Sequence, residues 1–129
     1  MIKFDEQKQL DSVAGALAIR KEIEGIAADV AGRGYKNICY LGIGGTYASA
    51  LQTQNHVQEY SGMEIIAQNA ALYNTTGNRR IGKDTVIVLS SVTGTTQEVV
   101  AAVEKAKAQG AVVIGFVDTA DTPLEKLSD

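Results

Sequence analysis

Four short apolar runs, separated by stretches with helical periodicity, constrain the fold of this chain most strongly. The runs cover residues 38–41, 63–68, 85–89 and 111–117, and helical patterns occupy residues 46–61 and 96–109. A glycine ends each of these helical patterns, at Gly62 and Gly110. Short apolar runs that alternate with helices are typical of parallel βαβ units, whose strands are buried on both faces. The sequence therefore predicts an α/β fold: a three-layer αβα sandwich around a parallel sheet of about four to five strands.

A helical segment precedes these units. Apolar residues recur at helical spacing in two stripes that are out of phase with each other, and both stripes lie between residues 4 and 31. We therefore expect two helices, or one bent helix, with the change near residues 15–18 and the end at the glycines of residues 32–34. This pattern predicts a helical segment over residues 1–34 and a domain over residues 35–129.

The C-terminal residues predict a short helix that starts at Pro123, because proline suits the first position of a helix. In an α/β fold such a helix normally leads into another strand. No apolar run follows it, so we expect the domain to be cut before its last strand.

Charge and cysteine content narrow the classes of partner. Fifteen acidic and twelve basic residues give a net charge of -3, which offers no electrostatic reason to expect nucleic acid or an anionic membrane as partner. No apolar run approaches the roughly 20 residues of a membrane span, and charged residues near the N-terminus argue against a signal peptide. Cys39 is the single cysteine. We expect a cytoplasmic protein without a disulfide, a metal site or a cofactor.

Two polar loops stand where a strand passes into a helix, at residues 42–46 and 90–96. In open parallel sheets, ligands bind beyond the carboxyl ends of the strands. Free N–H groups and the helix dipole attract anions there, and hydroxyl groups add donors without a fixed charge. A small phosphorylated ligand fits this arrangement best.

Nucleotides fit less well. The chain lacks the GxxxxGK[ST] sequence of a nucleoside-triphosphate loop. The first loop also lacks the third glycine of a dinucleotide fingerprint, and Gln68 and Asn69 stand where an acidic residue would contact a ribose.

Turn formation and helix capping are the structural alternative for the second loop. Thr95 and Glu98 match the T-x-x-E pattern of a capping box, which predicts that they cap the following helix. Capping leaves Ser91, Thr93 and Thr96 without an explanation.

Both loops carry a family resemblance. "SSVTGTTQEVV" resembles the S-x-[ST]-G-x-T-x-E-[VT] loop of the sugar isomerase (SIS) domain, and "LGIGGTYASA" resembles that family's G-x-G-[ST]-[ST]-x-x-A loop. The resemblance implies a flavodoxin-like fold and a phosphosugar site. The site residues that it implies are Gly44, Gly45, Thr46, Ser91, Thr93, Gly94 and Thr96.

The resemblance also implies a role for each of these residues. The hydroxyl groups would hold the sugar phosphate, Gly94 would let the backbone approach it, and Gly44 and Gly45 would shape the turn beside the sugar. The chain departs from the family pattern at Gly45, where many members carry a hydroxyl group, and at Thr93, where serine is commoner.

Within the family, the chain looks most like the N-terminal half of tandem-SIS enzymes. These include fructosamine 6-phosphate deglycases and the isomerase part of glucosamine 6-phosphate synthase. The resemblance implies an aminosugar-phosphate deglycase or isomerase that moves a proton between C1 and C2, and pairing as a homodimer or with a second SIS domain. The alternative is a non-catalytic sugar-phosphate sensing module of a transcription regulator.

The catalytic residue stays unassigned. A proton transfer between C1 and C2 needs a base beside the sugar. Glu98 is expected to cap a helix, Glu64 and Asp118 are expected to be structural or solvent-facing, and His56 is expected at the surface or a subunit interface.

Overall fold

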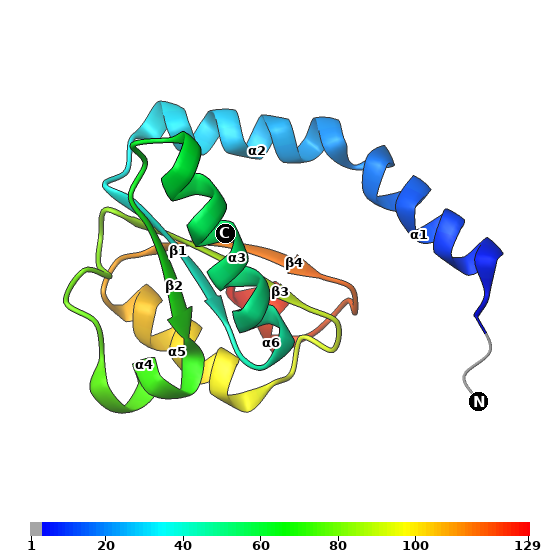
Figure 1. Cartoon of the computed structure of the whole chain (residues 1–129). Coiled ribbons are helices and arrows are strands. Elements are labelled where there is room, and N and C mark those ends of the chain that lie inside the picture. Colours follow the sequence, from blue (N-terminus) through cyan, green and yellow to red (C-terminus); the bar gives the residue numbers. More distant parts are fainter. Residues whose placement is uncertain (1–3) are drawn as a thin grey trace. The chain divides into compact units, whose positions relative to one another are not determined.

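Residues 4–129 are described by the computed structural model, and the chain divides into two compact units between Gly34 and Tyr35. The first unit holds α1 (Glu6–Ala18) and α2 (Arg20–Arg33) (Figure 1). The carboxylate of Asp5 begins α1 by accepting the N–H of Lys8 at 3.0 Å. The described residues of this segment form two helices, with the boundary at Ile19, one residue beyond the expected window.

The second unit is a four-stranded, fully parallel sheet in the order β2-β1-β3-β4. Its strands are β1 (Asn37–Gly42), β2 (Ile65–Asn69), β3 (Thr85–Ser91) and β4 (Val112–Val117). The helices of this unit are α3 (Gly45–Tyr60), α4 (Ala70–Thr76), α5 (Gln97–Ala108) and α6 (Pro123–Leu127) (Figure 1). The predicted α/β sandwich is confirmed, and Pro123 begins the last helix as expected.

The main core lies between one face of the sheet and the helices α4, α5 and α6. Alternate residues of the strands point to this face and become fully buried, as Cys39, Leu41, Ile87, Leu89 and Val113 do. The apolar stripe of α5 repeats at helical spacing and packs on these strands; it consists of Val99, Ala102, Val103 and Ala106. Each buried aliphatic side chain of this size stabilises the fold by roughly 1.5–3 kcal/mol.

Helix α4 was not predicted from the sequence, which turns polar after the second strand. The side chain of Asn69 caps this helix by accepting the N–H of Leu72 at 3.1 Å, and Tyr73 is completely buried against the core. Packing of Tyr73 outweighs the weak helix propensity of the Asn and Thr residues that follow it. No helix within residues 4–129 has both the length and the apolar character to cross a lipid bilayer.

Candidate functional site

The strand order changes direction between β1 and β3, at a switch point in the middle of the sheet. One of the two predicted loops follows each of these strands. The strands β1 and β3 are neighbours, with Leu41 opposite Leu89 near their carboxyl ends. From β1 the chain continues through α3 to β2 at one edge of the sheet, and from β3 it continues through α5 to β4 at the other. In open α/β sheets such a divergence leaves a crevice at the carboxyl ends of the two strands.

The first loop is a tight turn built on glycine. A Cβ atom on Gly42 would stand 2.7 Å from the backbone of Thr46 and Tyr47, so only glycine lets the start of α3 approach the strand this closely. Gly44 precedes α3 with a φ of 56°, a left-handed conformation that favours glycine. A Cβ atom on Gly45 would meet no atom within 4 Å, so open space lies beside that residue.

Thr46 holds this turn together with its hydroxyl group. Its Oγ1 accepts the N–H of Ile43 at 3.0 Å and donates to the carbonyl oxygen of the same residue at 2.9 Å. The N–H groups of Gly45, Thr46 and Tyr47 have no hydrogen-bond partner among residues 4–129. At the first loop, the free donors are therefore backbone N–H groups, and the Thr46 hydroxyl shapes the turn.

Backbone hydrogen bonds join the second loop to the segment that follows β4. The N–H groups of Asp118, Thr119 and Leu124 donate to the carbonyl oxygens of Ser91, Val92 and Gly94, at 3.2, 3.2 and 3.1 Å respectively. These hydrogen bonds fix the backbone of the loop.

Gly94 is required by packing as well as by conformation. Its φ is 64°, and a Cβ atom there would stand 2.1 Å from Oγ1 of Thr122 and 2.9 Å from Cγ1 of Val117. The resemblance implied that this glycine makes room for a ligand. The space in which a Cβ would stand is filled by Thr122, so the glycine also lets the loop pack on the segment between β4 and α6.

The three hydroxyl residues of the second loop differ in how they are engaged. Oγ of Ser91 accepts the N–H of Gly94 at 3.0 Å, and Oγ1 of Thr93 accepts the N–H of Thr95 at the long distance of 3.5 Å. The hydroxyl of Thr96 has no partner within the described residues. Ser91, Thr93 and Thr96 therefore all keep a hydroxyl hydrogen that can be donated to a ligand.

The predicted capping box is wrong. Helix α5 takes Thr96 as its N-cap, one residue later than the capping box requires, and no side chain bonds the helix start. The positive φ of Gly94 and its hydrogen bond to Leu124 set the direction in which the chain enters the helix. As a result, the N–H groups of Gln97 and Glu98 have no partner within the described part of the chain. Two uncapped helix N-termini thus flank the switch point.

The acidic and histidine residues considered above lie outside the two loops. Glu64 pairs with Arg80, just before the start of β2. His56 is exposed on α3, with its ring centroid 4.9 Å from that of Tyr60. Ten residues of helix separate His56 from Thr46, which is about 15 Å. Glu98 lies exposed in the first turn of α5. Among residues 4–129, no three His, Cys, Asp or Glu side chains are grouped so that they could hold a metal ion.

The strongly perturbed titratable groups lie in the core. Burial raises the pKa of the Cys39 thiol from 9.0 to about 12, and the charge of Arg80 opposes this shift. Burial also raises the pKa of the Tyr73 hydroxyl, with a further contribution from Cys39. These two groups support the fold and are not part of the loops.

Sequence reasoning missed the residues that support the loops. Ser90, which had no expected role, lies with its hydroxyl 3.2 Å from that of Tyr40. Asn69 stands opposite Gly42 in the register of β1 and β2, beside the first loop, where it caps α4. Asn74 ties α4 to α5 by donating to the carbonyl oxygen of Glu98 at 2.9 Å. An Asn directly before a helix start is a recognisable capping signal, whereas the contacts of Ser90 and Asn74 depend on tertiary structure.

Comparison with protein families identifies one match. The family model described as "SIS domain" matches residues 33–129, which include both loops.

Solved structures of similar fold include sugar-phosphate enzymes. The tagatose-6-phosphate ketose/aldose isomerase of Escherichia coli aligns with a TM-score of 0.76 and 16% identity over 90% of this chain and 33% of its own. A proposed phosphosugar isomerase of Salmonella typhimurium LT2 aligns with a TM-score of 0.73 and 29% identity over 81% of this chain and 32% of its own. The chain thus spans about a third of the length of these two proteins.

A curated sequence relative is described as a transcriptional regulator. An uncharacterised HTH-type transcriptional regulator of Clostridium perfringens is 48% identical over 46 residues, which are 36% of this chain and 16% of the regulator.

Proposed function

The chain belongs to the SIS domain family, and we propose that its loops after β1 and β3 together bind the phosphate of a phosphorylated sugar or aminosugar. The observation that carries this proposal is the pair of uncapped helix N-termini at one switch point. Each presents N–H groups without a partner among the described residues, and the second adds free hydroxyl hydrogens. Backbone N–H and hydroxyl donors at the positive ends of two helix dipoles suit a small dianion.

The residues of the site have distinct roles in this proposal. Thr96 and Ser91 donate their hydroxyl hydrogens to phosphate oxygens, and Thr93 supplies a third, more exposed hydroxyl. Gly44 and Gly45 turn the backbone so that the N–H groups at the start of α3 face the same ligand, and Thr46 holds that turn closed. Gly94 sets the path of the second loop through its packing on Thr122.

Isothermal titration with fructose 6-phosphate, glucosamine 6-phosphate, fructose and ATP tests this proposal. We expect saturable binding of the two sugar phosphates and none of fructose or ATP. Hydrogen bonds to a charged group contribute about 1.5–3 kcal/mol. Thr96→Val and Ser91→Ala should therefore each weaken sugar-phosphate binding about tenfold or more. Ser90→Ala is the matched control, because that hydroxyl faces Tyr40. Unchanged affinity in the Thr96 and Ser91 variants would contradict the site assignment.

For the reaction, we propose that the domain serves an aminosugar-phosphate deglycase or isomerase that transfers a proton between C1 and C2. Its likeness to phosphosugar isomerases of similar fold supports this. The loops supply binding donors and no base, so the base comes from residues outside the two loops. Turnover of fructosamine 6-phosphate or fructose 6-phosphate by the complete gene product that contains this chain is the expected result. Tight binding without turnover of either compound would contradict the enzymatic part.

The second candidate function is a sugar-phosphate sensing module of a transcription regulator. The local similarity to an HTH-type regulator favours this alternative. In that case the complete gene product would bind DNA, and its affinity for DNA would change when a sugar phosphate occupies the loops. DNA affinity that is identical with and without saturating sugar phosphate would exclude a sensing role.

For assembly, we propose that the domain pairs with a second SIS domain or with a second copy of itself. Light scattering after size-exclusion chromatography tests the homodimer directly. A mass of one chain at every concentration would leave only pairing with a different SIS domain.

A further inference from the structure

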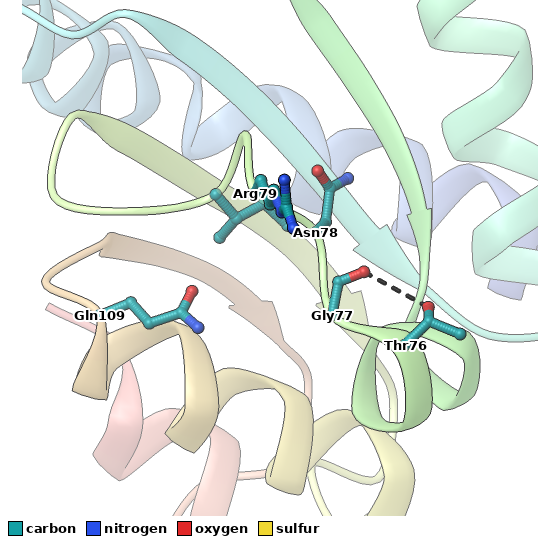
Figure 2. Close-up of a pocket in the computed structure, with 6 residues that line it drawn as sticks. Thr76, Gly77, Asn78, Arg79 and Gln109 are labelled. Atoms are coloured by element: carbon teal, nitrogen blue, oxygen red, sulfur yellow. Dashed lines mark hydrogen bonds between the residues drawn. The ribbon is translucent and has the colours of Figure 1, made fainter.

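An open surface pocket of about 360 Å³, with Arg79 and Gln109 exposed at its rim, lies on the α4/α5 side of the second unit, away from the two loops. Its lining residues are Thr76, Gly77, Asn78, Arg79, Ile81 and Gln109. Figure 2 shows Gln109 reaching from the end of α5 toward the segment that carries Asn78 and Arg79. Since α5 has 12 residues, this pocket lies about 18 Å along the helix from the second loop. The pocket is therefore separate from the two loops.

Several unengaged polar groups of this pocket are hydrogen-bond donors. Arg79 makes no ion pair and no side-chain hydrogen bond within residues 4–129, although the adjacent Arg80 pairs with Glu64. Gln109 accepts the hydroxyl hydrogen of Tyr73 on Oε1 at 2.9 Å, which leaves its Nε2 hydrogens without a partner among the described residues. The backbone N–H groups of Asn78 and Arg79 also lack a partner there. An acceptor-rich ligand would satisfy these groups.

The other polar groups of the wall are already engaged and hold its shape. The side chain of Asn78 donates to Oε1 of Gln68 at 2.8 Å and accepts the N–H of Arg80 at 3.0 Å. Thr76 donates its hydroxyl hydrogen to the carbonyl oxygens of Leu72 and Gly77. These contacts are consistent with a pocket that is formed before a ligand arrives.

The charge balance of the pocket favours an anion with one negative charge. None of its lining residues is acidic. The end of α4 would contribute negative potential through its last carbonyl groups. Lys105 neutralises it, because its Nζ donates to the carbonyl oxygens of Tyr73 and Asn74 at 2.8 and 3.1 Å. One guanidinium group, that of Arg79, therefore remains free for a ligand.

We propose that this pocket binds a small organic monocarboxylate, with its carboxylate on the guanidinium of Arg79 and the Nε2 group of Gln109. A guanidinium matches the two oxygens of a carboxylate in a bidentate fork. Ile81, which is only 5% exposed, supplies an apolar wall for the body of the ligand. The proposal is independent of the sugar-phosphate site, since it uses none of that site's residues.

An NMR titration of the full chain with sodium propionate tests the proposal, with uncharged propionamide and inorganic phosphate as comparison ligands. We expect saturable shifts of the side-chain amide of Gln109 and of the backbone amides of Asn78 and Arg79. Propionamide should produce no saturable shifts there, and phosphate should bind the pocket more weakly than propionate. Shifts with propionate that do not saturate, or tighter binding of phosphate than of propionate at these residues, would overturn the assignment.

Variants make the test specific. Arg79→Gln should weaken propionate binding about tenfold or more, because it removes a charge-assisted pair. Gln109→Glu keeps an acceptor for the Tyr73 hydroxyl and places a negative charge in the pocket, so it should abolish binding while the chain stays folded. Arg80→Gln is the matched control and should leave the propionate affinity unchanged. Equal affinities in the Arg79→Gln variant and the original chain would overturn the proposal.

Discussion

Gly94→Ala is the substitution whose effect the structure predicts most sharply. An L-residue at a φ of 64° adopts a left-handed conformation, which costs roughly 1–2 kcal/mol. The new Cβ would also stand 2.5 Å from Cβ and 2.1 Å from Oγ1 of Thr122, whose side chain is almost fully buried and donates to the carbonyl oxygen of Thr119. Overpacking of this kind costs typically 1–3 kcal/mol. The free energy of unfolding should therefore fall by about 2–5 kcal/mol.

Intrinsic tyrosine fluorescence is the suitable probe for this change. The chain has no tryptophan, and its five tyrosines all lie at or after Tyr35, so the signal reports on the second unit alone. For a domain of this size 1 kcal/mol corresponds to roughly 4–8 °C in the melting temperature. Gly94→Ala should thus lower the melting temperature by about 10 °C or more.

The matched control is Gly45→Ala, at a glycine of the other loop. Its φ is not positive and an added Cβ would meet no atom within 4 Å. Because alanine favours a helix over glycine by up to about 1 kcal/mol, this change should leave the stability equal or slightly higher. A Gly94→Ala variant that unfolds within 0.5 kcal/mol of the original chain, a margin usual for neutral surface changes, would refute the packing argument.

Three further substitutions test the core. With a pKa of about 12, the Cys39 thiol should react with a thiol reagent roughly a thousandfold more slowly than in the unfolded chain; a disulfide-exchange assay at neutral pH checks this. Because burial raises the pKa of the Cys39 thiol in the folded state, the neutral thiol makes its full contribution to stability below pH 9. This contribution is lost as the pH rises toward 12. Denaturant titrations should show stability falling about 1.4 kcal/mol per pH unit more steeply than in Cys39→Val. Asn37→Asp should destabilise the second unit by about 3 kcal/mol in urea unfolding, because it faces a buried carboxylate toward the carbonyl oxygen of Arg80. Tyr73→Phe should cost about 1 kcal/mol in the same assay, since the hydrogen bond to Gln109 is lost.

The strands and long helices could be predicted because their side-chain patterns are local. The apolar run that contains Ile87 and Leu89 marks a strand buried on both faces, and Pro123 marks a helix start. Helix α4 could not be predicted in this way, because its stability depends on the burial of Tyr73 against distant strands. Its Asn69 cap was visible in the sequence but was outweighed by the polar residues that follow.

The position of the two loops in the fold could be predicted from the sequence, but the contacts of each loop residue could not. The two loops were found because glycine and hydroxyl residues gather after apolar runs. The capping box failed because the entry into α5 is set by Gly94 and its contact with Leu124, which is distant in sequence. Likewise, the reason for Gly94 lies in Thr122, which no local pattern connects with it.

The most direct test of the central claim is to map where a sugar phosphate binds. An NMR titration with fructose 6-phosphate should shift two groups of backbone amides in a saturable way. These are the amides of Gly45, Thr46 and Tyr47 at the start of α3 and those of Gln97 and Glu98 at the start of α5. Fructose without phosphate should shift neither group. Saturable shifts confined to other parts of the chain, or shifts at only one of the two helix starts, would contradict a shared phosphate site.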